Sequence, residues 1–228
     1  IVVMPGTGFD VVPTDALAAM LKRELPDATE LVLAFDAGGG PSQGTAKTAV
    51  EGLAAGGKIR RDGQLVSVPL AYKTREFEFE GERRFAMTIP WGDVYTAYVS
   101  TGIPNIEVYM GVPPKTAERV RRMNFIRPLL GLGFVQSWLK SQATKRGPGP
   151  SDDKRSHSRT VVWGEARNAE GREVRKVLVT PNGYDLTAHA SFGILQKVLQ
   201  DKPAGGFYTA SQLMGPDYVL GLPGVRML

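Results

Sequence analysis

A glycine-containing turn near the start of the chain has the composition of a ligand-binding loop. Residues 6–11 (GTGFDV) follow a short apolar strand and precede a helix, which is the setting of a dinucleotide-binding turn. That turn needs the third glycine of G-x-G-x-x-G so that helix and strand can pack closely. Val11 stands at this position, and Pro13 delays the helix, so no helix N-terminus lies beside the glycines to hold a pyrophosphate. We therefore interpret residues 6–11 as a tight structural turn.

A second glycine-rich loop, residues 38–45 (GGGPSQGT), lies between a predicted buried strand and a predicted helix. Its backbone N–H groups and the hydroxyls of Ser42 and Thr45 could hold an anion or a carboxylate. The loop lacks the Gly-Lys-Ser/Thr ending of a nucleoside-triphosphate loop. A structural turn and a contact with a small ligand are equally supported by the sequence.

The remaining titratable residues form no catalytic or metal-binding set in the sequence. His157 in a polar loop and His189 in a predicted helix are too far apart to suggest a metal site or a Ser-His-Asp triad. The absence of cysteine excludes disulfides, thiolate metal ligands and cysteine nucleophiles. Asp10, Asp36 and Asp93 each follow a strand or precede a helix, and Asp93 could simply be an N-cap. We therefore expect no metal site.

Strands and helices that position these loops follow from the spacing of apolar and turn-forming residues. The helix predicted over 13–25 has Thr14 or Asp15 as its N-cap. From 58 to 89 the apolar period is two, and Asp62-Gly63 predicts a hairpin turn. The predicted strands are 1–4 (buried), 30–37, 58–61, 64–68, 76–80, 84–89, 106–110, 159–167 and 172–180. The predicted helices are 13–25, 45–53, 93–101, 114–145 with a break at Pro128, 184–199, and a short one near Ser211.

These elements predict an α/β (α+β) protein with a mixed, largely antiparallel sheet flanked by helices. The composition is that of an ordinary globular domain, with 42% hydrophobic residues. No stretch reaches the roughly 20 apolar residues that span a bilayer, and no basic region precedes an apolar run as in a signal peptide. We expect a cytoplasmic protein.

Positive charge is concentrated in one part of the chain. Eleven basic and three acidic residues lie between Lys115 and Arg159, so this segment carries +8 and the remainder −3 of a net +5. Within it, residues 125–139 are nearly all apolar and recur at helical spacing. Packing against the sheet or a second subunit in a homodimer is the favoured interpretation. The alternative is an interfacial helix or lid, with peripheral membrane contact through 124–146 and basic side chains meeting anionic headgroups. Nucleic-acid binding is not favoured, because aromatic residues do not interleave with the basic ones.

Several motifs together resemble the saccharopine-dehydrogenase-like family, which includes saccharopine reductases and the trans-acting enoyl reductases of lipid synthesis. They run from residue 6 to about residue 165, and the Gly- and Pro-rich tail fits the same pattern. The matching motifs are 8–15 (GFDVVPTD), 39–45 (GGPSQGT), 100–106 (STGIPNI), and 149–151 (GPS) followed by Arg155 and 163–165 (WGE).

The resemblance implies an N-terminal Rossmann domain that binds NADP or NAD, followed by a mixed-sheet domain that shapes the substrate cavity. Residues 1–25 would be the last strand–helix unit of the nucleotide-binding domain. Residues 26–183 would form the substrate and dimerisation domain, and 184–228 would return to the nucleotide-binding domain. The phosphate-binding glycine loop would then lie upstream of Ile1, so the chain alone is expected to be inactive.

By the same resemblance, a hydride passes from the cofactor to a C=C or C=N bond of a small-molecule or acyl substrate. Gly8, Phe9 and Asp10 would contact the nicotinamide end of the cofactor. The residues implied to bind the substrate are Ser42, Gly44, Thr45, Asp93, Ser100 and Thr101. The resemblance assigns no general acid. The alternative function is a non-catalytic module on the same scaffold that dimerises or binds a lipid surface.

Overall fold

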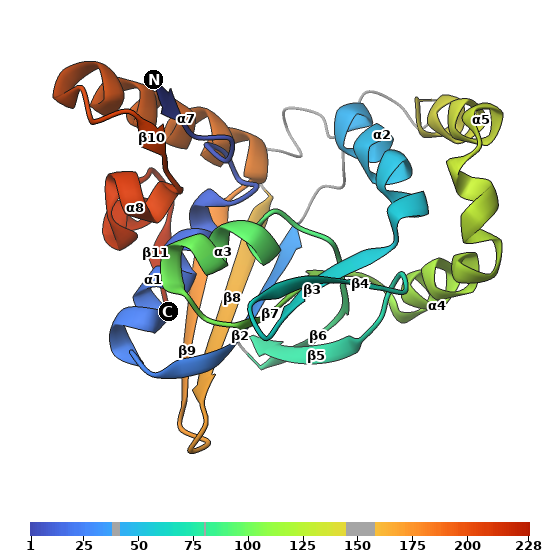
Figure 1. Ribbon diagram of the computed structural model, residues 1–228, viewed down its shortest axis with the longest axis horizontal. Coiled ribbons are helices and arrows are strands. Elements are labelled where there is room, and N and C mark those ends of the chain that lie inside the picture. The colour runs from blue at the N-terminus through green and yellow to red at the C-terminus, as the bar shows by residue number, and fades with distance from the viewer. Residues whose placement is uncertain (38–41, 80, 145–157) are drawn as a thin grey trace.

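Nine strands of the described part of the chain form one mixed sheet. The computed structural model describes residues 1–37, 42–79, 81–144 and 158–228 (Figure 1). The strands are β2 (Ala28–Ala37), β3 (Gly57–Arg61), β4 (Gln64–Val68), β5 (Thr74–Phe79), β6 (Glu82–Thr88), β7 (Asn105–Gly111), β8 (Arg159–Asn168), β9 (Glu173–Pro181) and β11 (Arg226–Met227). Their order is β11-β9-β8-β2-β7-β3-β4, and the hairpin β5–β6 joins β7 through β6. Only β2 and β7 pair in parallel within this sheet of described residues. The predicted mixed, largely antiparallel sheet is confirmed.

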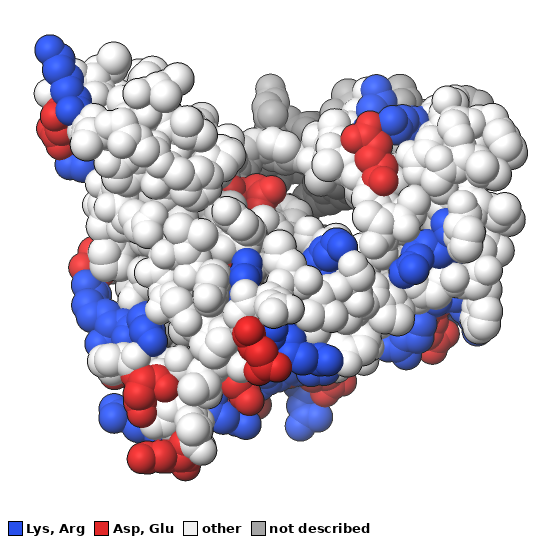
Figure 2. Space-filling view, in the orientation of Figure 1, with Lys and Arg blue, Asp and Glu red and all other residues white. Residues whose placement is uncertain are grey.

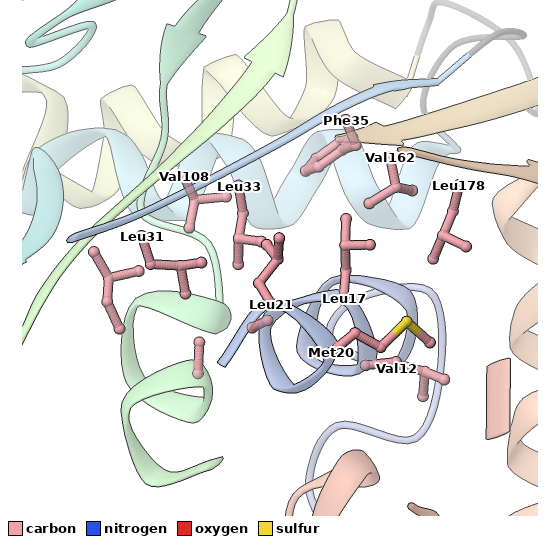
Figure 3. Close-up of a cluster of buried hydrophobic side chains, with 14 of the residues drawn as sticks. Val12, Leu17, Met20, Leu21, Leu31, Leu33, Phe35, Val108, Val162 and Leu178 are labelled. Atoms are coloured by element: carbon pink, nitrogen blue, oxygen red, sulfur yellow. The ribbon is translucent and has the colours of Figure 1, made fainter. Parts of the chain in front are cut away.

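The helices flank this sheet, and one of them supplies much of its core. They are α1 (Val12–Glu24), α2 (Gln43–Gly52), α3 (Asp93–Thr101), α4 (Pro114–Arg122), α5 (Gly133–Thr144), α7 (Gly183–Asp201), α8 (Ala210–Met214), and the 3₁₀ helices η1 (Leu53–Ala55), η2 (Met123–Gly131) and η3 (Pro216–Gly221). Figure 3 shows Leu17 and Leu21 of α1 beside Leu33 of β2 and Val162 of β8, all of them fully buried. The helix lies so close that a Cβ on Gly164 of β8 would be 2.8 Å from the Leu21 side chain.

The start of α1 differs from the prediction. The N-cap residue is Val11, not Thr14 or Asp15, and both of these lie buried in the first turn of the helix. Val11 has φ 103°, which is unfavourable for a β-branched residue. A short turn imposes this conformation, because the Val12 N–H donates to the Gly8 carbonyl at 3.0 Å and Pro13 follows at once.

β1 (Val2–Val3) lies outside the large sheet. It pairs in parallel with β10 (Gly206–Phe207), so the C-terminal segment returns to the N-terminal strand (Figure 1). The prediction of a buried strand here is wrong: Ile1 is fully exposed and Val3 is 46% exposed, because β10 covers only one edge of β1. α1 shares the core of the large sheet. The division into 1–25, 26–183 and 184–228 stays a prediction.

Two helical segments project from the sheet as an arm, which we define as residues 42–55 (α2, η1) and 114–144 (α4, η2, α5) (Figure 1). Within the arm α2 packs on α5, and η1 packs on η2. The α-helical segment is interrupted around Pro128, as predicted, by the 3₁₀ helix η2. η2 itself continues through the proline, because a 3₁₀ helix accepts its φ, and ends before Leu132, where ψ is 132°.

Hairpins and the C-terminal tail complete the sheet. Asp62 and Gly63 have φ 49° and 76°, as in a type I′ turn, so the predicted hairpin is confirmed. The short helix near Ser211 is also confirmed as α8. The sequence did not predict β11, which adds to the edge of β9 through only two residues.

Candidate functional site

The turn that precedes α1 forms one wall of an open cleft of about 460 Å³. Small-molecule sites have volumes of about 300–1,000 Å³. The predicted cofactor residues Gly8, Phe9 and Asp10 all line this cleft. The other lining residues are Pro5, Gly6, Thr7 and Val11 of the turn, Gly92, Tyr95 and Thr96 at the start of α3, and Thr187 of α7.

Close packing accounts for both glycines of the turn. A Cβ on Gly6 would lie 2.8 Å from the Val11 Cβ, and one on Gly8 would lie 2.7 Å from the Thr187 Cγ2. The first N–H of α1, from Val12, already donates to the Gly8 carbonyl, and Pro13 has none to offer. The helix N-terminus therefore has little capacity for a pyrophosphate, which agrees with the interpretation of residues 6–11 as a structural turn.

Phe9 is held from two sides. Its N–H donates to the Thr187 Oγ1 at 2.9 Å, and its ring lies so close to Gly183 that a Cβ there would be 3.1 Å from the Phe9 Cγ. On the other side it meets Phe35 of β2 edge-on, with 5.5 Å between ring centroids, and Phe35 packs on Trp91. This wall of the cleft is thus fixed to the central sheet and to α7.

The start of α7 also contacts the second predicted ligand loop. The Ser42 N–H donates to the Tyr184 hydroxyl at 2.7 Å. The Ser42 Oγ accepts the Thr45 N–H at 3.2 Å, so Ser42 is the N-cap of α2. Residues 38–41 of the loop lie outside the described part of the chain. Ser42, Gly44 and Thr45 do not line the cleft, and their contact with substrate stays a prediction.

Asp93, Ser100 and Thr101 lie on α3 but do not line the cleft either. The Thr101 Oγ1 donates to the Ala97 carbonyl at 2.5 Å. The Ser100 hydroxyl donates to the Asp15 carboxylate. Asp93 is the first residue of α3 rather than its N-cap, which is Gly92. Their assignment to the substrate stays a prediction.

A buried polar network explains the position of Ser100. Asp15 accepts a hydrogen bond from the Ser211 N–H at 2.7 Å as well as the bond from Ser100. The Ser100 Oγ lies 2.6 Å from the Thr209 Oγ1, and Thr209 is the N-cap of α8. The network therefore fixes α1, α3 and α8 relative to one another, beside the cleft.

Burial raises the pKa of the carboxyl groups around the starts of α1 and α3. Burial raises the pKa of Asp93 well above its usual value, and neighbouring Asp15 and Asp10 raise it further. A hydrogen bond with the Thr14 side chain lowers the pKa of Asp93, but burial has the larger effect. Asp10 reaches solvent through the cleft, but partial burial of its carboxyl raises its pKa, while a hydrogen bond from the Gly92 amide lowers it. The cleft thus contains a carboxyl group able to keep its proton at a higher pH than an ordinary aspartate.

Outside the turn before α1, the lining residues are Gly92, Tyr95, Thr96 and Thr187, and none of them was predicted. Thr187 and Ser191 are four residues apart on α7, and the Ser191 hydroxyl donates to the Thr7 carbonyl at 3.0 Å. Two small hydroxyl residues four positions apart lie on one face of a helix, and this spacing was the sequence signal that could have identified Thr187. For Tyr95 and Thr96 the sequence offered no indication of a binding role other than their position next to Asp93.

The other candidate residues lie elsewhere. Asp36 pairs with Arg84 at 3.3 Å on the β5–β6 side of the sheet, and His189 is exposed on α7. His157 lies outside the described residues. Within the described ranges, no three His, Cys, Asp or Glu residues are placed to hold a metal ion. No described helix has the length and apolar character needed to cross a bilayer.

Comparison with solved structures identifies the architecture. The structure superposes on apo saccharopine dehydrogenase (L-Glu forming) from Saccharomyces cerevisiae with a TM-score of 0.61, over 100% of this chain and 74% of that chain. The fold is that of saccharopine dehydrogenase. Sequence identity over the superposed residues is 11%, so the likeness is one of fold. No family model matches the sequence, and no curated protein matches it. The saccharopine-dehydrogenase-like fold implied by the motifs is thus confirmed.

Proposed function

We propose that this chain forms the substrate side of an NAD(P)-dependent oxidoreductase that reduces a C=C or C=N bond of a small-molecule or acyl substrate. The observation that carries the proposal is the cleft beside α1, in which Phe9 and Asp10 face an open volume of about 460 Å³ within a saccharopine-dehydrogenase-like fold. The cleft combines aromatic walls, hydroxyl groups and one carboxyl group, as expected of a site that positions a polar, planar group.

The cleft fits the nicotinamide end of a dinucleotide and not its pyrophosphate. Phe9 and Tyr95 offer aromatic surface, and Thr96 and Thr187 are polar residues of the same lining. The Val12 N–H is already used, and the neighbouring Asp10 carboxylate would repel phosphate when ionised. When bound, a reduced nicotinamide supplies the hydride.

The surface around β1 supports a nucleotide-binding unit that docks there. Parallel strands are normally buried on both faces, yet β1 and β10 leave Val3 and Phe207 exposed. Leu195 and Leu199 of the nearby helix α7 are also exposed. We propose that further parallel strands continue this small sheet, and that the phosphate-binding glycine loop belongs to them, upstream of Ile1.

Asp10 is the proton donor that we propose for the reaction. Its carboxyl lines the cleft, and burial favours the protonated form. A protonated Asp10 can donate its proton to the substrate atom that gains negative charge, a role that contributes about 10²–10⁴-fold to the rate of a reaction. Phe9 and Tyr95 offer aromatic surfaces that would orient the substrate beside Asp10.

The test uses the longer polypeptide that includes the residues upstream of Ile1. We expect it to bind NADPH or NADH saturably, measured by nicotinamide fluorescence, and residues 1–228 alone to show no saturable binding. Micromolar affinity of the isolated chain would contradict the proposed location of the phosphate-binding loop.

Asp10→Asn in the longer polypeptide tests the proton-donor role. We expect a loss of about 10²-fold or more in the rate of reduction, with nucleotide affinity unchanged. The activity of the unchanged protein should fall as pH rises through the pKa of Asp10, and this limb should vanish in Asp10→Asn. Asp62→Asn, in the hairpin turn between β3 and β4, is the control and should keep both rate and pH profile.

A further inference from the structure

The arm carries a continuous run of apolar side chains that nothing in the described part of the chain covers. Phe125 is 90% exposed, Phe134 is 75% exposed and Trp138 is 60% exposed. The other exposed members of the run are Ile126, Leu129 and Leu132. Six large apolar residues within fourteen positions of η2 and α5 are more than the scattered exposure that is usual on a protein surface.

Basic residues adjoin this run along the chain and on the surface. α4 carries Lys115, Arg119, Arg121 and Arg122 against one acidic residue, Glu118, and all five are exposed. None of these four basic residues forms an ion pair with an acidic side chain that the structure describes. Figure 2 shows a largely uncharged surface over α5 and η2, and basic side chains over α4 below them.

We propose that η2 and α5 bind the surface of an anionic lipid bilayer, with the apolar run inserted between headgroups and α4 facing the lipid phosphates. An element of this kind has aromatic and aliphatic residues on one side and arginine or lysine beside them. The attraction of anionic lipid amounts to about 1 kcal/mol for each basic residue near the surface. The proposal does not depend on the proposed oxidoreductase function.

A second copy of the chain fits this surface less well. In a two-fold dimer the same patch meets itself, so the interface would bring the basic residues of both α4 helices to one surface. The like charges of these basic residues would then repel, whereas a negatively charged bilayer neutralises them. The arm also projects away from the sheet, which lets it reach a flat surface (Figure 1).

The packing of the arm suits such a role. In η2 only Leu130 is buried, and in α2 no residue is buried. Helices with so little core are easily displaced by a few ångströms, which allows the exposed side chains to settle between headgroups.

Vesicle co-sedimentation of the whole chain tests the proposal. We expect binding to vesicles of phosphatidylcholine mixed with phosphatidylserine, and at least about tenfold weaker binding to phosphatidylcholine alone. Phe134→Ser with Trp138→Ser should weaken binding to the mixed vesicles by about tenfold or more. Arg119→Gln with Arg122→Gln should weaken it to a similar extent and reduce its dependence on salt.

The matched control is Phe192→Ser with Leu195→Ser on α7. These two residues are exposed to similar extents, 60% and 53%, but lie outside the basic segment. The control variant should bind vesicles as the unchanged chain does. Equal loss in the control, or no binding of the unchanged chain to mixed vesicles, would overturn the proposal. So would a dimer in gel filtration that Phe134→Ser with Trp138→Ser converts to a monomer, combined with unchanged vesicle binding.

Discussion

Helix α1 and the arm have similar apolar sequences but opposite environments. Nine of the 13 residues of α1 are buried, and its leucines face β2 and β8 (Figure 3). In η2 and α5 the phenylalanines and Trp138 face outward, and Leu130 is the buried residue of η2. The difference shows that apolar content at helical spacing predicts an amphipathic helix, but not what covers its apolar side.

The two regions also differ in how their polar groups are used. α1 contains a carboxylate, Asp15, that holds three elements together through Ser100 and Ser211. Among the described residues, the arm is linked to its surroundings by hydrogen bonds that involve no buried carboxylate, such as those from the Ser42 N–H to the Tyr184 hydroxyl and between the Asn124 side chain and the Leu70 backbone. The region around α1 is therefore expected to unfold with the whole protein, and the arm is expected to open on its own.

The largest expected effect is the difference in the free energy of unfolding between two Leu→Ala variants, one in α1 and one in the arm. Leu17→Ala in α1 removes a fully buried side chain and should lower the free energy of unfolding by about 3 kcal/mol. Leu129→Ala in η2 removes a side chain that is 55% exposed and should change it by less than about 0.5 kcal/mol. Urea unfolding followed by circular dichroism measures both. Equal losses would mean that the arm belongs to the core.

A second pair of substitutions adds one methyl group in each region. Gly164→Ala places a Cβ 2.8–2.9 Å from the ends of Leu21 and Leu17 and should destabilise the fold by about 2 kcal/mol. Gly52→Ala, at the end of α2 where nothing lies within 4 Å, should be neutral or stabilise the protein by about 0.5 kcal/mol. Thermal unfolding of the two variants compares them directly, and destabilisation by Gly52→Ala would argue for tight packing in the arm.

Asp93→Asn should change how stability depends on pH. The pKa of Asp93 is higher in the folded than in the unfolded protein, so its contribution is most favourable below the unfolded pKa. That contribution is lost as pH rises through the folded pKa, by up to about 1.4 kcal/mol for each pH unit. Asparagine stays neutral, so the variant should gain stability relative to the unchanged protein as pH rises above the pKa of Asp93 in the unfolded protein, about 3.9. Parallel stability curves above that pH, measured by urea unfolding, would show that Asp93 does not titrate in this way.

The smallest expected effect on stability comes from removing a helix N-cap, and we compare the caps of α2 and α8. Ser42→Ala removes the cap of α2 and should destabilise that helix by about 1 kcal/mol, which is visible as faster hydrogen exchange over residues 46–52. The melting temperature of the whole protein should not change. Thr209→Ala removes the cap of α8 together with a contact to Ser100, and it should lower the melting temperature. A lowered melting temperature in Ser42→Ala would show that the arm and the core unfold together.

Local patterns predicted most of the elements correctly. Alternating residues and the Asp62-Gly63 turn identified the hairpin β3–β4, and apolar runs identified β2, β8 and β9. The errors have two causes: a local turn geometry that the residue types did not reveal, and the pairing of segments far apart in the chain. Val11 takes the N-cap position because the Gly8 carbonyl holds the next amide, and β1 is exposed because its only described neighbour is the two-residue strand β10.

For the site, the sequence identified residues and the tertiary structure decided which of them face the same space. The motif around Phe9 and Asp10 was recognisable in the sequence, because turn-forming residues follow each other along the chain. Thr187 joins them only because α7 returns to Gly8 after more than 170 residues. Ser100 belongs to a motif, yet its hydroxyl bonds to Asp15 and Thr209. Sequence spacing specifies helices, strands and turns, because these depend on neighbours along the chain. The walls of the cleft and the exposure of the arm depend on long-range packing, which the same spacing does not specify.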